Sequence, residues 1–452
     1  MKEIISSTIV FALITLILSV VGLAGYLEHY TEQDGVGVDC VSAICIDQFG
    51  VKWLAGRASK YVSRFDENNW EGYPISGSGV VDMALDDAGR PWVVTGGCIG
   101  YLWKGVFQRL NYPLLSAYSA VAWSPDGALW TGGWVGELEV WRSFDPLSAS
   151  QWKCWKGLIP WKFAIDADGR VWCVGATCSI GGSYYEVGVC RISADGESWD
   201  RIDDNVRLPT GIRYQQVCAS PDGRVWVQGF SDEAPPDCRC LPPFYSDDYE
   251  SWFKFDESPF SAGNPSADYP LYINSVTKGG IWFVSSGAAV YYDYQDWRFI
   301  RVPSNVNVIQ VDERTDDVWF GTNDGVYVMR GGPEAWPPVW IELEAGVDEA
   351  GGAEAFSLFG SAEFQMDLNL DLYVAVQLPS GDLLFAPDWS PTMSPLVPGL
   401  EVPIGLNIED MPLVTVDTAG MPAGMYRWFA ACTHAGSMDF ASNIASCEWQ
   451  FE

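Results

Sequence analysis

The segment from residue 231 to residue 270 carries the side chains best suited to ligand chemistry. It contains nine acidic residues, and aromatic residues lie between them. Aromatic rings can stack on sugar rings, and carboxylate oxygens are ligands for Ca²⁺. Because long loops often carry binding residues, we expect a ligand site here, with a solvated loop whose rings pack on the neighbouring sheet as the alternative. The candidate ligand residues are Tyr245, Tyr249, Trp252, Asp247 and Asp248.

The other chemistry-bearing residues argue against several functions. The sequence has two histidines, His29 and His434, and no Cys-x-x-Cys pair, which argues against zinc fingers, haem ligation and a histidine-based triad. Its 26 basic and 59 acidic residues give a formal net charge of −33, which repels nucleic acid. We therefore expect no cofactor and no nucleic-acid partner, with Ca²⁺ as the one ion to consider.

A repeat of tryptophans provides the framework that must hold these residues. Seven tryptophans each follow a turn, and consecutive ones lie 39, 38, 42, 54, 56 and 37 residues apart. Six have glycine three positions earlier, and five have Asp or Ser six positions earlier, as in Asp166, Gly169 and Trp172. Glycine suits a hairpin turn because one turn residue needs a positive φ. The seven are Trp53, Trp92, Trp130, Trp172, Trp226, Trp282 and Trp319.

This period of about 40 residues, with short strands in each repeat, predicts the blades of a β-propeller. One small sheet cannot bury both of its faces, so stacking the blades in a ring removes the indoles from water. We expect seven four-stranded blades over residues 39–338, with the seven tryptophans buried between adjacent blades. The chain is expected to leave the ring near residues 336–340, with no spare strand to close the ring.

The Asp-x-x-Gly-x-x-Trp core resembles the blades of the two-component-regulator propeller and streptogramin-lyase-like families, over roughly residues 40–340. In those families the core is structural, so the resemblance implies the fold. The variants Asp126-Gly127 and Asp168-Gly169 also resemble the Asp-box of sialidases. A streptogramin-lyase-like activity would need a histidine in the channel, and no histidine falls within the seven repeats. We therefore expect no enzyme, with a glycosidase or lyase as the alternative.

The twelve cysteines, an even number outside metal-binding motifs, favour disulfides in an oxidising compartment. Cys432 and Cys447 flank a predicted terminal hairpin, and we expect them to be bonded and to close a loop of about 15 residues. Spacing does not fix the other pairings, and buried thiols are the alternative for Cys45 and Cys218. Together with the acidic composition, the cysteines predict an extracellular or cell-surface protein.

The N-terminal segment is uncharged from residue 4 to residue 27. A helix of this length would be about 36 Å long, enough to span a bilayer. Three interpretations stay open: a cleaved signal peptide with a small-x-small site at residues 22–24, a retained membrane anchor, and a filament-forming helix. Glu3 directly follows Lys2, which weakens the basic start that a signal peptide normally has.

The third interpretation comes from a resemblance. An apolar helix with one glutamate near its start is similar to the type IV pilin-like helix, which bundles in a filament core while the heads face outward. The resemblance implies that Glu3 pairs with the amino terminus of a neighbouring copy. We predict one continuous helix over residues 1–30 that assembles with its own copies, and a linker at residues 31–38. The assembly residues are Glu3, Lys2, Ile9, Phe11, Ile14 and Ile17.

Residues 339–452 differ in composition, since Arg427 is their only Lys or Arg. Eight short alternating segments predict an antiparallel β-sandwich of immunoglobulin-like type. The stretches DLYVAVQLPSGDLLF and NIASCEWQF resemble a small C-terminal domain of secreted bacterial repeat proteins, which implies a surface location.

The sequence therefore predicts an all-β chain: a seven-bladed β-propeller and a C-terminal immunoglobulin-like β-sandwich, preceded by one hydrophobic N-terminal α-helix. The predicted function is a structural subunit of an extracellular pilus-like filament, with the helix in the core and the propeller and sandwich displayed for adhesion or ligand binding. The alternatives are a secreted or membrane-anchored propeller that binds a carbohydrate or protein, and a glycosidase or lyase.

Overall fold

The computed structural model of the chain describes residues 27–38, 40–66, 69–77, 79–110, 117–134, 138–156, 158–178, 185–193, 195–204, 206–231, 242–255, 272–285, 288–295, 297–335, 339–348, 355–364, 368–403, 406–418, 421–437, 440–442 and 444–451. The predicted assembly residues Lys2, Glu3, Ile9, Phe11, Ile14 and Ile17 lie outside these ranges, so the filament helix stays a prediction. Within the described ranges, no helix has the length and apolar character needed to cross a bilayer.

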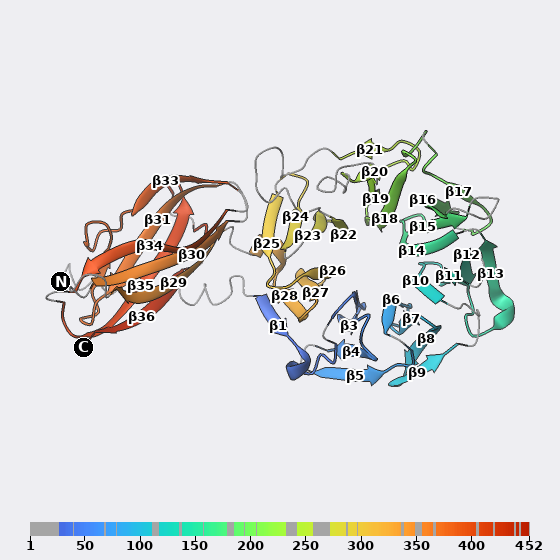
Figure 1. Cartoon of the computed structure of the whole chain (residues 1–452), viewed down its shortest axis with the longest axis horizontal. Coiled ribbons are helices and arrows are strands. Elements are labelled where there is room, and N and C mark those ends of the chain that lie inside the picture. The colour runs from blue at the N-terminus through green and yellow to red at the C-terminus, as the bar shows by residue number, and fades with distance from the viewer. Residues whose placement is uncertain are drawn as a thin grey trace. The chain divides into compact units, whose positions relative to one another are not determined.

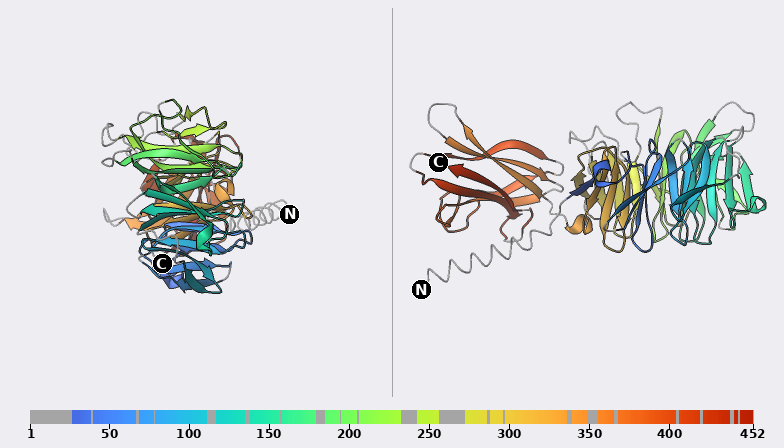
Figure 2. Two further views of the ribbon diagram at one scale, coloured as in Figure 1. Left: turned by 90° about the vertical axis from the view of Figure 1, so that its right-hand side faces the viewer. Right: turned by 90° about the horizontal axis from the view of Figure 1, so that it is seen from below.

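Seven four-stranded sheets, counted over the described residues, surround a common centre (Figure 1). Figure 2 shows the same ring edge-on. The arrangement is consistent with the predicted propeller blades. The first three sheets consist of β2 Ala43–Ile46, β3 Lys52–Ala55, β4 Tyr61–Phe65 and β5 Trp70–Pro74; β6 Val80–Leu85, β7 Pro91–Thr95, β8 Cys98–Trp103 and β9 Val106–Arg109; and β10 Ala117–Trp123, β11 Leu129–Trp134, β12 Leu138–Ser143 and β13 Trp152–Lys156.

The remaining sheets repeat this order, with the first strand of each sheet nearest the centre of the ring (Figure 1). The fourth to sixth sheets consist of β14 Leu158–Ile165, β15 Val171–Cys178, β16 Tyr185–Ile192 and β17 Trp199–Arg201; β18 Ile212–Ala219, β19 Val225–Ser231, β20 Phe244–Ser246 and β21 Phe253–Lys254; and β22 Tyr272–Val276, β23 Ile281–Ser285, β24 Ala288–Tyr292 and β25 Trp297–Arg301. The seventh sheet contains β26 Val306–Asp312, β27 Asp317–Thr322 and β28 Gly325–Met329.

The fourth strand of the seventh sheet comes from the other end of the chain. β1 (Leu27–Tyr30) pairs antiparallel with β28, with Leu27 opposite Met329 and Tyr30 opposite Val326. Two predictions are therefore corrected: the ring does have a strand that closes its seam, and residues 27–30 are not part of a helix. Pairing with β1 satisfies backbone groups that an open edge of β28 would leave exposed.

The predicted linker at residues 31–38 is also built into the ring. A 3-10 helix spans Glu32–Asp34, and Thr31 caps it by accepting a hydrogen bond from the backbone N–H of Gln33 at 3.2 Å. Val36 and Val38 are fully buried in the apolar cluster that contains Trp319. Because these valines are buried, the segment fixes the N-terminal strand to the first and seventh sheets rather than serving as a loose connection.

The Asp-x-x-Gly turns position the repeated tryptophans. The carboxyl of Asp166 accepts the backbone N–H groups of Asp168 at 3.0 Å and Arg170 at 2.9 Å, and the indole N–H of Trp172 at 2.8 Å. Gly169 completes the turn with a φ of 78°. The aspartate of this motif is therefore fully used in holding the turn and the indole.

Six of the seven repeated tryptophans are at most 1% exposed, as predicted. Trp53 is the exception, because it is only half-buried and its indole N–H has no acceptor among the described residues. The burial prediction is wrong for this one position. The six buried indoles are Trp92, Trp130, Trp172, Trp226, Trp282 and Trp319.

The chain divides into two compact units, of which one includes Pro333–Glu452. This unit has two sheets that share one apolar core containing Phe356 and Trp428, and the short helix α2 (Gly332–Ala335) lies at its start. The predicted immunoglobulin-like type stays a prediction. One sheet contains β29 Val339–Asp348, β30 Ala355–Phe364 and β34 Asn407–Asp417, and the other β31 Leu368–Gln377, β32 Leu383–Phe385, β33 Val397–Val402, β35 Gly424–His434 and β36 Ala445–Phe451.

The predicted disulfide between Cys432 and Cys447 is wrong, because both cysteines are free. β35 and β36 do pair, but Cys447 lies opposite Trp428. That register separates the two cysteines by four positions, which corresponds to about 13 Å along a strand. A disulfide requires Cα atoms within about 4.4–6.8 Å. Sequence spacing suggested a hairpin correctly but could not supply its register.

Candidate functional site

The predicted ligand residues of residues 231–270 are used mainly for packing. The ring of Tyr245 lies 4.9 Å from the ring of Trp226 in the same sheet. Tyr249 and Trp252 lie 5.6 Å and 5.8 Å from Trp172 in the preceding sheet. Because these three rings cover the repeated tryptophans, they have little surface left to stack on a sugar. The alternative interpretation, a loop that packs on the neighbouring sheet, fits the described part of this segment better.

The acidic residues of the same loop are also engaged. Asp247 accepts a hydrogen bond from the Arg224 guanidinium at 3.3 Å. Asp248 accepts the backbone N–H groups of Ser251 at 2.6 Å and Glu250 at 2.9 Å, and these two hydrogen bonds lower the pKa of Asp248 to about 2. Both carboxylates are therefore engaged in contacts within the protein.

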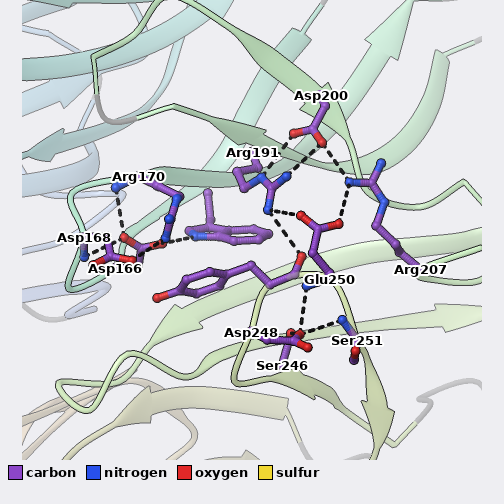
Figure 3. A network of polar contacts seen from close by, with 12 residues as sticks. Asp166, Asp168, Arg170, Arg191, Asp200, Arg207, Ser246, Asp248, Glu250 and Ser251 are labelled. Atoms are coloured by element: carbon purple, nitrogen blue, oxygen red, sulfur yellow. Dashed lines mark hydrogen bonds and ion pairs between the residues drawn. The ribbon is translucent and has the colours of Figure 1, made fainter.

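An ion-pair network joins this loop to the fourth sheet (Figure 3). Arg191 lies 3.1 Å from Asp200 and 3.0 Å from Glu250, and Arg207 lies 2.7 Å from Asp200. Glu250 belongs to the fifth sheet's loop, so the network fastens two consecutive sheets. Over the described ranges, no group of three or more His, Cys, Asp or Glu side chains is placed to hold a metal ion.

The centre of the ring offers a different arrangement, built on Lys162 of β14. Its ammonium nitrogen lies 3.2 Å from the Gln216 side-chain oxygen on β18 and 3.5 Å from the Asn274 backbone oxygen on β22. These strands are the innermost strands of the fourth, fifth and sixth sheets (Figure 1). Because the fourth and sixth sheets are not neighbours, the lysine side chain must cross the inner edge of the fifth sheet. Its ammonium group therefore lies at the centre of the ring.

Polar side chains connect the inner strands around this lysine. Asp82 on β6 accepts the backbone N–H of Val121 on β10 at 2.9 Å. Asn274 on β22 accepts the backbone N–H of Ile309 on β26 at 2.6 Å. In both places a side chain of one sheet binds a backbone N–H on the innermost strand of the next sheet. These contacts hold the sheets in register and give the centre a polar lining.

The charge at the centre is not balanced by direct contact. Within the described residues Lys162 forms no ion pair, and its two oxygen contacts are to neutral groups. Asp82 is an acidic group whose charge interacts with Lys162. Burial raises the pKa of Asp82 to about 6, although the N–H groups of Val121 and Met83 and the charge of Lys162 oppose the shift. The carboxyl therefore becomes neutral in mildly acidic solution, which leaves the charge of Lys162 without this counterpart.

An exposed indole directly precedes the central lysine in the chain. Trp161 sits at a β-bulge, where the pairing of β14 with β15 shifts between Pro160 and Lys162. Its side chain is 40% exposed, in contrast to the repeated tryptophans. A bulge redirects a side chain at a sheet edge, and the edge here is the inner one. A cation and an aromatic ring on adjacent positions can bind an anionic group attached to a flat or apolar body.

The sequence contains a periodic signal for this site, which is a polar residue at a fixed distance before some of the repeated tryptophans. The tenth position before the repeated tryptophan holds Asp82 and Lys162 in the second and fourth repeats and Gln216 in the fifth, within otherwise apolar strands. A polar residue that interrupts an apolar inner strand can mark the lining of a central channel.

One of the two histidines lies within the ring, but not at its centre. His29 is on β1, the outermost strand of the seventh sheet, where its ring stacks on Tyr327 at 4.0 Å. Its Nε2 atom lies 2.7 Å from the backbone oxygen of Asp324. Residues 39–338 contain no histidine, and His29 joins the seventh sheet only because β1 completes it.

No protein-family model and no curated protein matches this chain. Among solved structures, it is similar to the extracellular domain of a hybrid two component system from B. thetaiotaomicron, with 15% identity, a TM-score of 0.52, and coverage of 94% of this chain and 59% of that one. A second such extracellular domain from the same organism has 13% identity, a TM-score of 0.50, and coverage of 93% and 57%. Virginiamycin B lyase from Staphylococcus aureus has 13% identity, a TM-score of 0.48, and coverage of 68% and 99%.

At these identities the sensor-domain similarities show the fold alone. They agree with the predicted resemblance to two-component-regulator propellers at the level of four-stranded, propeller-like sheets. The chain spans less than two thirds of the length of either sensor domain. The pilin-like helix and the C-terminal immunoglobulin-like β-sandwich stay predictions.

Proposed function

We propose that this chain is an extracellular or cell-surface propeller that binds a ligand at the centre of its ring and does not act as an enzyme. The observation that carries the proposal is the Lys162 ammonium group, which crosses the inner edge of the fifth sheet without an ion-pair partner in the described part of the chain. The ligand is a carbohydrate or a protein segment with an anionic group for Lys162 and a flat or apolar part for Trp161. The fold of the extracellular sensor domains supports the same assignment.

The proposal is tested by screening the full chain on arrays of acidic and neutral oligosaccharides and peptides. The variant Lys162→Met removes the charge and keeps an unbranched side chain of similar length. Lys278→Met is the matched control, because Lys278 is exposed in a turn of the sixth sheet. We expect acidic ligands that bind the wild-type chain and the control but not Lys162→Met. Equal binding by all three proteins, or no acidic ligand at all, would contradict a ring-centre site.

A filament subunit or membrane anchor is the second candidate, and the position of β1 favours it. β1 directly follows residues 1–26 and is hydrogen-bonded into the seventh sheet. The Arg330 guanidinium also lies 3.0 Å from the Glu28 carboxylate and 2.6 Å from the Asp317 carboxylate, so β1 is fastened to β27 as well. Tension on an N-terminal segment would therefore be transmitted to the ring.

Deleting residues 1–26, which removes the apolar segment and retains β1, tests this second candidate. We expect a folded, monomeric head from the truncated chain, and fibres or detergent-dependent assemblies from the full chain, as seen by electron microscopy and size-exclusion chromatography. Fibres formed equally by both proteins would exclude the N-terminal segment as the filament core.

A further inference from the structure

Two cysteines of the fourth sheet lie directly opposite each other. Cys173 on β15 pairs with Cys190 on β16 in the antiparallel register of these strands. Both are thiols in the structure, and both are fully buried. They belong to one apolar cluster, which also contains Trp130 of the third sheet. Both side chains therefore lie on the side of the fourth sheet that faces the third.

The backbone geometry of this pair suits a disulfide. The backbone N–H of Ile202 donates to the Val189 oxygen at 2.9 Å, so Val189 directs its backbone groups toward β17 and Cys190 directs its own toward β15. Opposite residues that exchange backbone hydrogen bonds have Cα atoms about 5.5 Å apart, and a disulfide requires about 4.4–6.8 Å. The register that separates the two C-terminal cysteines therefore brings Cys173 and Cys190 together.

The side chains are also close. The Cys173 thiol donates to the Cys190 backbone oxygen at 3.7 Å. The Cβ atoms of opposite residues lie about 4.5–5.5 Å apart and those of a disulfide about 3.5–4.5 Å. The two strands therefore need to close by about 1 Å for the sulfur atoms to bond.

Among the described strands, no other cysteine has a cysteine as its directly opposite residue. Cys178, the third cysteine of this sheet, lies opposite Tyr185 and five positions from Cys173, about 17 Å along the strand. It is too far from either member of the pair to bond. The opposite residues elsewhere are Trp53 for Cys45, Thr95 for Cys98, Trp141 for Cys154, Trp226 for Cys218, Leu372 for Cys432 and Trp428 for Cys447.

Burial determines when this pair can react. It raises the pKa of the Cys190 thiol to about 12 and the pKa of the Cys173 thiol well above its usual value. The thiolate is the reacting form of cysteine, so the folded pair reacts slowly with reagents in solution. A bond between the two sulfur atoms must therefore form before the third sheet covers the fourth.

We propose that Cys173 and Cys190 are an oxidation site and form a cross-strand disulfide when the chain folds in an oxidising compartment. The oxidant is a protein or small-molecule disulfide. One cysteine attacks a sulfur of the oxidant, forms a mixed disulfide and releases one thiol; the other cysteine then attacks the mixed disulfide and releases the second thiol. The pair loses two protons and two electrons, and the oxidant is reduced to two thiols.

The bond encloses residues 174–189 and joins two strands of the sheet whose innermost strand carries Lys162. Only the compartment in this inference rests on the proposed extracellular location. Ligand binding at the ring centre is not needed, so the variant Lys162→Met should form the same disulfide as the wild-type chain.

The test is peptide mapping of the full chain after export to the oxidising periplasm of a bacterial host. The protein is unfolded in urea with N-ethylmaleimide and without reductant, and is then digested. Trypsin leaves all three cysteines of this sheet in one peptide, residues 171–191, so a glutamate-specific protease is added to cleave after Glu186. We expect residues 171–186 and 187–191 to be joined, with the mass of two hydrogen atoms missing, and to separate on reduction.

The variants identify the bonded pair. Cys178→Ala should retain the joined peptides, and Cys173→Ala should lose them. Cys98→Ala is the matched control, because Cys98 is also buried but lies opposite a threonine. In urea titrations, reduction should raise the equilibrium constant of unfolding of the wild type by on the order of 100-fold more than that of the double variant Cys173→Ala/Cys190→Ala.

The inference is overturned if N-ethylmaleimide modifies both Cys173 and Cys190 of the exported wild-type chain. It is also overturned if the joined peptides persist in Cys173→Ala, which would assign the bond of Cys190 to Cys178. A disulfide present in Lys162→Met as in the wild type, whatever the outcome of the ligand screen, would support the oxidation site independently of the ring-centre proposal.

Discussion

The repeated tryptophans allow a direct test of how the ring is held together, through the variants Trp172→Phe and Trp53→Phe. Both substitutions keep an aromatic ring and remove one indole N–H. At Trp172 that N–H binds the buried carboxyl of Asp166 at 2.8 Å. At Trp53 it has no acceptor among the described residues. The same chemical change should therefore have different energetic consequences at the two positions.

The magnitudes follow from these contacts. Trp172→Phe removes a hydrogen bond to a carboxylate, worth about 1.5–3 kcal/mol, and the smaller ring adds a packing loss of about 1 kcal/mol. We expect it to lower the free energy of unfolding by about 2–4 kcal/mol. Trp53→Phe removes a buried donor that has no partner, which offsets the loss of ring area. Its effect should stay within about 1 kcal/mol.

Urea unfolding of the full chain, followed by circular dichroism, measures both effects as differences in the free energy of unfolding. The m-values of the two variants should match that of the wild type, because the same surface is exposed on unfolding. Trp319→Phe serves as a further comparison. Its indole is fully buried but has no acceptor among the described residues, so it should resemble Trp53→Phe in the hydrogen-bond contribution. Equal losses at Trp172 and Trp53 would refute the role assigned to Asp166.

Three further predictions concern buried polar groups. The ammonium of Lys52 lies 3.0 Å from the buried carboxylate of Asp312 in the seventh sheet, so Lys52→Met should destabilise the ring by about 3–5 kcal/mol in urea titrations. Burial alone would raise the pKa of Asp312, but Lys52 and the Arg314 N–H hold that pKa below its usual value. The ionised Asp312 should therefore stabilise the wild-type fold above about pH 4 and lose this effect as the pH falls further. Lys52→Met should not show this pH dependence. The pKa of Asp82 is raised to about 6, so its contribution to stability is present below about pH 4 and is lost as the pH rises through 6. The free energy of unfolding of the wild type, relative to that of Asp82→Asn, should therefore be larger at about pH 4.5 than at about pH 7.5. Burial raises the pKa of Cys432 to about 12 and that of Cys447 to about 11, and both should be alkylated completely in urea without reductant, as counted by mass spectrometry.

The ring could be predicted from sequence because its turn chemistry is local. In the fourth repeat, Asp166, Gly169 and Trp172 lie within seven positions, and the hydrogen bonds that join them are formed within that stretch. A short motif that satisfies its own donors recurs with the period of the blade. The number of sheets follows from the number of motifs, without knowledge of any distant contact.

The closing strand could not be predicted because its partner is about 300 positions away. β1 has four residues, Leu27–Tyr30, and only pairing with β28 identifies them as a strand. The apolar run that ends at residue 27 extended the expected helix across them. A short strand that pairs with a distant one leaves no periodic signal in the sequence. The predicted end of the helix and the predicted absence of a closing strand are therefore wrong for the same reason.

The packing of the candidate ligand residues could not be predicted from sequence for a related reason. The sequence of the loop alone favours Tyr249 and Trp252 as ligand residues. In the structure, both rings pack on Trp172 of the preceding sheet. Whether an aromatic residue is a platform for a ligand or a cover for another ring is decided by the neighbouring blade, which composition does not reveal.

The overall charge constrains what the ring-centre site can bind. A body with a net charge of −33 repels anions at long range, while Lys162 attracts them at short range. At physiological salt the Debye length is about 8 Å, so the repulsion is screened beyond the immediate surroundings of Lys162. A short acidic ligand that places its charge within that distance should therefore bind better as salt rises from low values, until direct screening of the contact takes over. A long polyanion would carry charge over the acidic surface and lose this advantage, so affinity should fall as the acidic chain is lengthened.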